Sequence, residues 1–119
     1  FDGRPDLFED KVHPRKAVGH KNIFFDTLVH DTGSLELLIK NQTSKQVIMG
    51  LDDPYPLGEM ESAKQSSYPG KILDLAIERK IISEQERNAI WEDNVIQWLC
   101  GDDADAKDKL VKRINPQSD

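Results

Sequence analysis

The sequence contains almost no cysteine, since Cys100 is the only one. A single cysteine excludes an internal disulfide and any cysteine-rich zinc module. Long apolar runs are missing too, and none approaches the length that a membrane-spanning helix needs. The stretch from Phe1 to Pro5 has no basic segment followed by an apolar one, so it does not resemble a secretory signal. From these absences we expect a cytoplasmic protein that does not enter a membrane.

Positive charge is also scarce. The 16 Lys and Arg residues are outnumbered by 22 Asp and Glu residues, which gives a formal net charge of −6. A chain with this balance is not expected to bind nucleic acid or an anionic membrane surface. Its 119 residues are enough for one small domain with a modest core.

Motifs of several common enzyme classes are missing as well. There is no glycine-rich phosphate loop and no nucleophile elbow. The three histidines, His13, His20 and His30, form neither a His-x-His nor a His-Glu-x-x-His pattern. We interpret His13 and His20 as surface residues, and His30 as a packed, hydrogen-bonded residue at the end of a strand. The histidines by themselves therefore indicate no metal site.

Two short apolar stretches predict β-strands. Residues 22–29 are rich in β-branched and aromatic side chains, and residues 47–49 form a shorter apolar run. Between them, residues 35–39 predict a short helix that is capped by Thr32 or Ser34. A strand, a helix and a second strand with short connections form a βαβ unit. We therefore expect an α/β fold in which the two strands are parallel.

Helical patterns resume after a polar loop that covers residues 59–70. Residues 71–80 carry apolar side chains at helical spacing. Ser83 and Glu86 then have the spacing of a capping box, in which the side chain of each residue accepts a hydrogen bond from the backbone amide of the other. A second helix should therefore begin at Ser83.

This second helix carries both tryptophans. We expect Ile90 and Trp91 to face the core, and Trp98 to belong to the core as well. Asn94 is expected to interrupt the helix and to start another turn, which Gly101 closes.

The remainder of the chain, residues 102–119, is charged and contains little to bury. We expect a surface helix from Ala104 to Ile114, followed by a frayed tail. The chain is thus divided into a folded segment, residues 1–101, and a charged C-terminal helix and tail, residues 102–119.

Asp52 and Asp53 are the strongest candidates for chemistry, because they follow the second strand. Carboxylates at the carboxyl end of a parallel strand occur where α/β barrels hold their active sites. The alternative is a simple turn, since Asp-Asp-Pro is common turn chemistry. Neighbouring strand residues point to opposite sides, so at most one of the two faces a shared site. We expect it to be Asp52, because Asp53 precedes Pro54 and begins the turn.

Two further charged residues are candidates for a role. Arg4 is either a surface charge or a clamp for an anion, since a guanidinium group matches a carboxylate with two hydrogen bonds. Asp26 lies within the first strand, and we expect it to be a paired structural carboxylate.

Several motifs together resemble a known family. In order along the chain they are Arg4-Pro5-Asp6-Leu7, Phe25-Asp26-Thr27-Leu28-Val29-His30-Asp31, Gly50-Leu51-Asp52-Asp53-Pro54-Tyr55-Pro56-Leu57-Gly58-Glu59, Pro69-Gly70-Lys71 and Asn94. The region that contains them, residues 3–101, is similar to the C-terminal part of the 2-amino-3-carboxymuconate-6-semialdehyde decarboxylase family in the amidohydrolase superfamily. The joint match of the first three motifs carries the resemblance, since each one alone is a weak signal.

The resemblance implies a fold, a cofactor and a partner. The family folds as a (β/α)8 (TIM) barrel, so residues 22–29 and 47–49 would be its last two parallel strands, with flanking helices. The barrel binds one divalent metal, usually zinc, which activates a water that adds to the substrate before carbon dioxide leaves. Asp52 falls on a metal-ligand aspartate that also handles the metal-bound water. Arg4 falls on an arginine that reaches across a dimer to the carboxylate of the substrate, a small carboxylic acid.

This sequence also departs from the family pattern. Leu51 replaces a small residue, Asp53 replaces an aromatic one, and Asp93 stands where a glycine precedes the asparagine. The histidine ligands of the family have no counterpart in these residues and belong upstream of residue 1. Because a zinc site needs three or four protein ligands, we expect the chain alone to bind no zinc tightly and to be inactive by itself.

Two other functions fit the same residues. One is a hydrolase of the same superfamily that acts on a related acid, and the other is a non-catalytic binding or assembly module that lacks the metal. Each predicted strand also exposes an edge that can pair with another strand. We therefore expect the chain to associate, either as a homo-oligomer or with the rest of a barrel.

Overall fold

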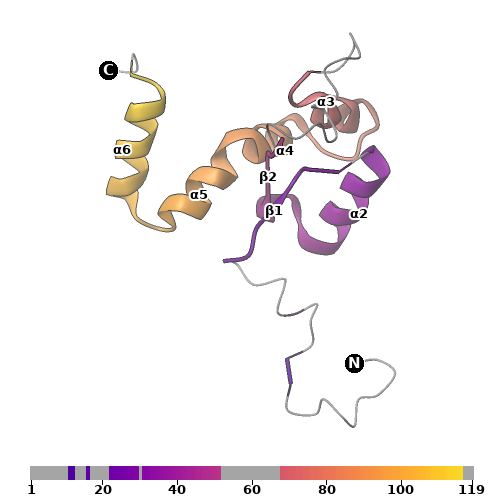
Figure 1. Ribbon diagram of the computed structural model, residues 1–119, viewed down its shortest axis with the longest axis horizontal. Helices are drawn as coiled ribbons and strands as arrows, with labels where there is room; N and C mark the ends of the chain where they lie inside the picture. The colour runs from indigo at the N-terminus through magenta and orange to yellow at the C-terminus, as the bar shows by residue number, and fades with distance from the viewer. Residues whose placement is uncertain (1–10, 13–15, 17–21, 30, 52–67, 117–119) are drawn as a thin grey trace.

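The fold is built around two short parallel strands. The computed structural model describes residues 11–12, 16, 22–29, 31–51 and 68–116. Strand β1 spans Phe25–Asp26 and strand β2 spans Val47–Ile48, with Phe25 opposite Val47 and Asp26 opposite Ile48. The prediction of an α/β fold with two parallel strands is confirmed (Figure 1).

Strand β1 is much shorter than the eight residues that the composition predicted. The carboxylate of Asp26 accepts a hydrogen bond from the Leu28 amide at 3.0 Å, and the Val29 amide donates to the Thr27 carbonyl at 2.7 Å. These two local bonds turn the backbone away from an extended course directly after Asp26. Strand pairing therefore stops there, although the side chains that follow favour a strand.

Helix α2, Thr32–Gln42, connects the two strands. Its N-cap is Asp31, whose carboxylate accepts from the Ser34 amide at 2.8 Å, so the predicted caps Thr32 and Ser34 were wrong. Thr32 is buried, and its hydroxyl accepts a hydrogen bond from Arg79. A 3-10 turn, η2, covers Ser44–Gln46 and leads directly into β2.

Among the described residues, five helical segments follow β2, and three of them, α4, η4 and α5, are continuous. Helix α3 spans Lys71–Glu78, and Ser83 with Glu86 forms the predicted capping box at the start of α4, Glu84–Asn88. A π-helical turn, η4, covers Ala89–Asp93 and runs into α5, Asn94–Cys100. The chain stays helical through Asn94, so no break occurs there, but a new segment, α5, does begin at Asn94 and is closed by Gly101 as predicted.

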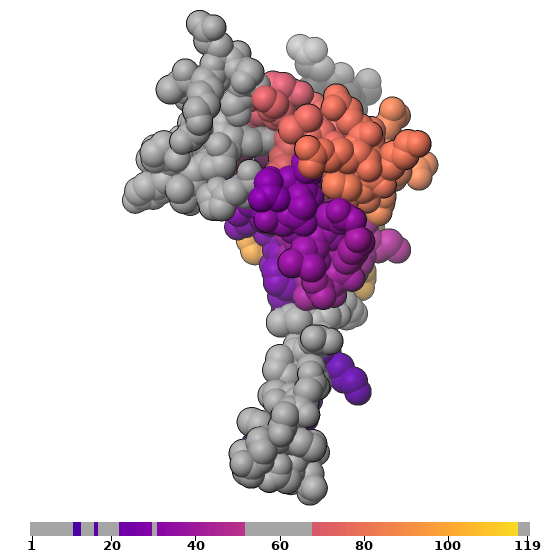
Figure 2. Space-filling model, turned by 90° about the vertical axis from the view of Figure 1, so that its right-hand side faces the viewer, coloured from indigo at the N-terminus to yellow at the C-terminus, as the bar shows by residue number. Residues whose placement is uncertain are grey.

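The core lies where α2 and α3 meet the strands and the π turn. Helix α2 packs against α3, and Figure 2 shows the two next to each other on one face. The buried apolar side chains are Leu35, Val47, Ile72, Leu73, Ala76, Ile82 and Ile90. They come from α2, β2, α3, the turn between α3 and α4, and η4, so the core holds β2 in place from several sides.

Both tryptophans lie at the surface, which corrects the prediction that they belong to the core. The Trp91 side chain is 42% exposed and that of Trp98 is 53% exposed. Trp91 lies against the backbone of Gly70, and the Arg87 guanidinium stands 5.3 Å from its ring centre. A large ring can fill this partly open position because one side packs and the other stays in solvent.

Helix α6, Ala104–Ile114, confirms the predicted surface helix. None of its residues is buried. In Figure 1 it lies beyond α5, at the opposite end of the structure from α2 and α3. It does not cover the sheet, so the core forms without it.

No helix in the described part of the chain is both long and apolar enough to cross a membrane. A pair of strands cannot establish a closed (β/α)8 barrel, so the barrel stays a prediction.

Candidate functional site

The carboxyl ends of both strands lie at the same edge, because β1 and β2 are parallel. Thr27, which follows β1 and is 3% exposed, connects the chain after β1 to the chain after β2 through its hydroxyl group. The Gly50 amide donates to the Thr27 hydroxyl oxygen at 3.2 Å. That hydroxyl lies 3.2 Å from the sulfur of Met49 and 3.4 Å from the Gly50 carbonyl oxygen. The backbone is therefore fixed two residues before Asp52.

Glycine is required at position 50 because Asp26 approaches it closely. A Cβ atom on Gly50 would lie 2.9 Å from the Cβ of Asp26. Asp26 itself is exposed, and its carboxylate accepts from Leu28. Among the described residues no cation forms an ion pair with it, so the predicted structural pairing stays a prediction. Asp26 places one acidic group at the carboxyl end of β1.

The side of β2 that faces away from β1 is held by the helical segment that contains η4. The Met49 amide donates to the Ile90 carbonyl at 2.9 Å. The side-chain amide of Asn94 donates to the Val47 carbonyl at 2.6 Å and to the Ser44 carbonyl at 2.8 Å. Sequence reasoning treated Asn94 as a helix breaker and a family motif, and so missed these contacts. The available signal was an amide side chain within a mostly apolar helical segment.

The predicted site residues lie outside the part of the chain that the structure describes. This holds for Arg4, Asp52 and Asp53, and for the three histidines. Leu51, which directly precedes Asp52, is described and is half-buried. The prediction that Asp52 faces the shared edge, and Asp53 the turn, therefore stays a prediction.

The described residues resume at Tyr68. Its hydroxyl donates to the carboxylate of Asp74 at 2.9 Å, and Arg87 donates to the same carboxylate at 2.9 Å. The hydrogen bond from Arg87, and then that from Tyr68, lower the pKa of Asp74. Gly70 has a left-handed backbone, with φ of 87° and ψ of 0°, and packs against Trp91. Residues 68–70 are thus held by contacts with α3 and η4, and Arg87 of α4 binds the same carboxylate as Tyr68.

A second carboxylate links η2 to α4. Glu86 accepts from the Ser83 amide at 2.9 Å and from the Ser44 hydroxyl at 2.8 Å. The backbone bond from Ser83, followed by the bond from Ser44, lowers the pKa of Glu86. Ser44 begins η2, which leads into β2, so the approach to the strand is bound to the capping box as well as to Asn94.

A metal ion would need ligands beyond those described. Within residues 22–29, 31–51 and 68–116, no group of three or more His, Cys, Asp or Glu side chains is arranged to hold one. The described residues therefore do not form the zinc site that the resemblance implies. Zinc, or another divalent metal, stays a prediction.

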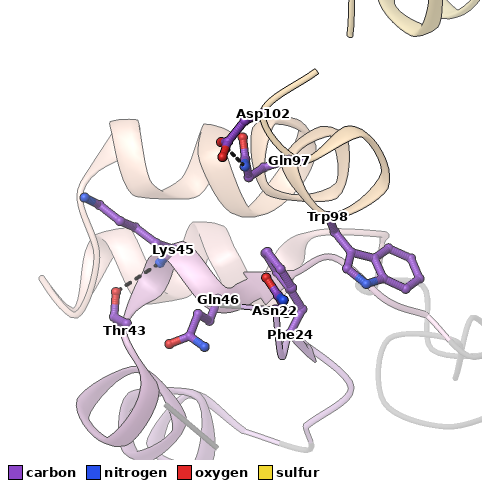
Figure 3. Close-up of a pocket in the computed structure, with 9 residues that line it drawn as sticks. Asn22, Phe24, Thr43, Lys45, Gln46, Gln97, Trp98 and Asp102 are labelled. Atoms are coloured by element: carbon purple, nitrogen blue, oxygen red, sulfur yellow. Dashed lines mark hydrogen bonds between the residues drawn. The ribbon is translucent and has the colours of Figure 1, made fainter. Parts of the chain in front are cut away.

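A cavity of about 500 Å³ opens at the other end of the strands. Its lining comes from residues that precede β1 and β2 and from the end of α5, as Figure 3 shows. The lining residues are Asn22, Phe24, Thr43, Lys45, Gln46, Gln97, Trp98, Gly101 and Asp102. The cavity thus lies at the amino ends of the strands, whereas barrel enzymes hold their chemistry at the carboxyl ends.

Comparisons with known proteins agree with the resemblance seen in the motifs. No family model matches the chain, and no solved structure matches it. Two curated proteins do, and both are named 2-amino-3-carboxymuconate-6-semialdehyde decarboxylase. The Dictyostelium discoideum protein is 31% identical over 101 residues, which cover 83% of this chain and 25% of that protein. The Caenorhabditis elegans protein is 35% identical over 98 residues, which cover 81% of this chain and 21% of that protein.

This chain spans about a quarter of the length of the curated relatives it matches. Within that quarter the similarity covers about four fifths of the chain, including the strands and the helices around them. The resemblance predicted from the motifs is confirmed, since the chain is similar over this stretch to two proteins named 2-amino-3-carboxymuconate-6-semialdehyde decarboxylase.

Proposed function

We propose that this chain forms part of a metal-dependent decarboxylase that acts on an acid similar to a carboxymuconate semialdehyde. The observation that carries the proposal is the similarity to two decarboxylases over about four fifths of the chain. The hydrogen bond between Thr27 and Gly50 supports the proposal, because it fixes the backbone shortly before Asp52. Carboxylates placed in this way are typical of catalytic barrel rims.

Two residues have proposed roles in this reaction. Asp52 would contribute one metal ligand and handle a proton at its free carboxylate oxygen. Arg4 would hold the carboxylate of the substrate with two parallel hydrogen bonds, reaching it from a neighbouring subunit. The remaining metal ligands would have to come from outside the described residues, since these contain no suitable cluster.

A chimeric enzyme tests the proposal. The corresponding stretch of the Dictyostelium relative is replaced by this chain, and release of carbon dioxide from 2-amino-3-carboxymuconate semialdehyde is measured. We expect the chimera to decarboxylate, and Asp52→Asn to lower kcat on the order of a thousandfold, since it removes a charged group at the reacting centre. Asp53→Asn is the matched control, and it should keep most of the activity.

Other outcomes of this assay would contradict the proposal. A folded chimera that hydrolyses a related acid without releasing carbon dioxide would indicate a hydrolase. A folded chimera with neither activity would indicate a non-catalytic binding or assembly module. Full activity in Asp52→Asn would show that Asp52 is not the reacting carboxylate.

We also propose that the chain acts in association, as a homo-oligomer or with the rest of a barrel, in the cytoplasm. A two-stranded sheet is marginally stable alone, and Trp98 and Leu99 expose apolar surface on α5. Sedimentation equilibrium measures the association. We expect a mass above that of the monomer, and a monomer with a cooperative thermal transition would contradict the proposal.

A further inference from the structure

The cavity at the amino ends of the strands brings amide side chains together around one exposed aromatic ring. Asn22 precedes β1, Gln46 ends η2 directly before β2, and Gln97 lies on α5. These three amides and Trp98 line a volume of about 500 Å³ (Figure 3). Such a volume is in the range of pockets that hold small molecules. All of these residues lie within the described part of the chain.

Two of the amides are held in place by bonds within the fold. Gln46 is 7% exposed, and its side-chain nitrogen donates to the Ile23 carbonyl at 2.8 Å. The side-chain oxygen of Gln97 accepts from Lys107 at 2.6 Å, and its nitrogen lies 3.5 Å from the Asp102 carboxylate. Because these bonds fix the two side chains beforehand, a ligand does not have to order them when it binds.

Trp98 gives the cavity an exposed aromatic surface. Its side chain is 53% exposed, although burial of a large apolar side chain is favourable. The other tryptophan, Trp91, instead packs against Gly70 and lies beneath the guanidinium group of Arg87. Trp98 therefore offers ring surface that a ligand can cover.

The lining of the cavity is polar but has no formal net charge. Among the residues that line it, Lys45 is the one cation and Asp102 the one anion. This balance favours a neutral ligand, because Asp102 repels anions and Lys45 repels cations. The amides and the Thr43 hydroxyl both donate and accept hydrogen bonds, as hydroxyl groups of a ligand also do. The lining therefore matches a neutral molecule that carries several hydroxyl groups.

We propose that this cavity binds a neutral cyclic sugar. The C–H bonds on one face of a sugar ring are slightly positive, so that face stacks on the negative face of the Trp98 indole. The hydroxyl groups around the ring pair with the amides and with Asp102, which accepts but does not donate. This inference goes beyond the proposed decarboxylation and does not depend on Asp52.

Nuclear magnetic resonance of the complete 119-residue chain tests the inference. The chain has two tryptophans, so its spectrum contains two indole N–H signals, which Trp98→Phe and Trp91→Phe assign. The probes are D-glucose, D-galactose and D-mannose. We expect at least one of them to shift the Trp98 signal to saturation and to leave the Trp91 signal unchanged. If none of the three produced a saturable shift, the inference would be overturned.

Two further probes separate a sugar ring from other ligands. Sorbitol carries the hydroxyl groups of glucose on an open chain, so it lacks the ring face and should not shift the Trp98 signal. Adenine stacks on aromatic side chains but has no hydroxyl groups. Equal shifts with sorbitol and the sugars would contradict stacking of a ring, and saturation by adenine alone would indicate a planar aromatic ligand instead of a sugar.

Trp98→Ala and Trp91→Ala form a matched pair of variants. Both indoles are partly exposed on one continuous helical segment, but only Trp98 lines this cavity. We expect Trp98→Ala to weaken sugar binding about tenfold, because the stacked ring is lost, and Trp91→Ala to retain it. The side-chain amide signals of Gln46 and Gln97 follow binding in both variants. Equal weakening in the two would contradict the proposed platform. The indole signals of the unchanged chain decide the inference if Trp98→Ala does not fold.

A second copy of the chain is the alternative occupant of this surface, since Trp98 and Leu99 are both exposed on α5. Dilution without sugar distinguishes the two. A Trp98 signal that moves on dilution, and that the sugars leave unchanged, would assign the indole to an interface between copies and overturn the sugar site. The titration measures no decarboxylation, so its failure would leave the proposed function standing. An inactive chimera would likewise leave the sugar site standing.

Discussion

Strand β2 is short but makes long-range contacts, whereas helix α6 is long and its ion pairs are local. Strand β2 has two residues, yet its backbone is held by bonds from Ile90 and Asn94, more than 40 positions away in sequence. Helix α6 has eleven residues, none of them buried. Its ion pairs join residues four positions apart, such as Lys109 with Asp105 at 2.7 Å. The number of long-range contacts, rather than the length of an element, shows how firmly it is fixed.

The two kinds of contact also differ in energy. A buried carbonyl that loses its donor costs about 1–3 kcal/mol, because no water replaces the bond. An exposed ion pair within a helix contributes about 0.3–0.5 kcal/mol, since water and salt screen it. We therefore expect changes around β2 to affect the whole fold, and changes in α6 to stay local.

The largest expected effect is that of removing a core side chain. Leu73→Ala empties a fully buried position in α3, and we expect it to lower the free energy of unfolding by about 3 kcal/mol. Leu110→Ala is the matched control in α6, where no residue is buried, and should cost less than about 1 kcal/mol. Urea denaturation of the two variants measures both values. Equal losses would show that α6 is part of the core, which would break the comparison.

Gly70→Ala comes next, because two costs act together. Position 70 has a positive φ of 87°, and an added Cβ would lie 2.5 Å from the Trp91 ring. We expect a loss of about 2 kcal/mol, since backbone strain of this kind costs about 1–3 kcal/mol before the clash is added.

Gly101→Ala provides the control for this clash. Its φ of 56° is also positive, but an added Cβ there meets nothing within 4 Å. It should therefore show the backbone strain alone. The double variant Gly70→Ala with Trp91→Ala should recover part of the stability lost by Gly70→Ala. An absence of recovery would mean that Trp91 is not the obstacle.

Much of the fold could be predicted from local patterns. The capping box at Ser83, the parallel strand pair and the bounds of α6 all depend on residues close in sequence, or on a simple connection rule. The end of β1 could not be predicted, because the composition of residues 22–29 favours a strand while the Asp26 carboxylate bonds the Leu28 amide. The tryptophans were misplaced for a similar reason, since an aromatic residue at helical spacing fits a half-open surface as well as a core.

The candidate residue Asp52 was proposed because it follows an apolar strand and matches a family pattern, and its role stays a prediction. The contacts that support its strand, from Asn94 and Thr27, join residues 47 and 23 positions apart. No local pattern reports such pairs. The π turn was likewise unpredictable, since its residues have ordinary helical spacing.

Acid pH should weaken the contact between η2 and α4. The pKa of Glu86 is lowered in the folded chain, so its charged form stabilises the fold. This contribution is present above the ordinary pKa of a glutamate, about 4.3, and it is lost as the pH falls below that value. In Glu86→Gln the free energy of unfolding should depend less on pH between about 5 and 3 than in the parent chain.

Thermal melts over this pH range measure the difference. Glu92→Gln, at an exposed position of η4, carries the same change of charge without the bonds to Ser83 and Ser44. It should keep the pH dependence of the parent chain. The same flattening in both variants would show that net charge, rather than the Glu86 contacts, causes the effect.

The smallest expected effects lie in α6, where Lys109 and Lys107 make different contacts. Among residues 22–29, 31–51 and 68–116, Lys109 pairs only with Asp105 one turn earlier, whereas Lys107 donates to Gln97 of α5 at 2.6 Å. Lys109→Ala should cost at most about 0.5 kcal/mol, and the cost should disappear at high salt, because an exposed pair is screened. Lys107→Ala should instead loosen α6 from α5, so exchange protection in α6 falls while that of Met49 stays unchanged. If either variant lowered the protection of Met49, α6 would be coupled to the sheet and the contrast between the two regions would fail.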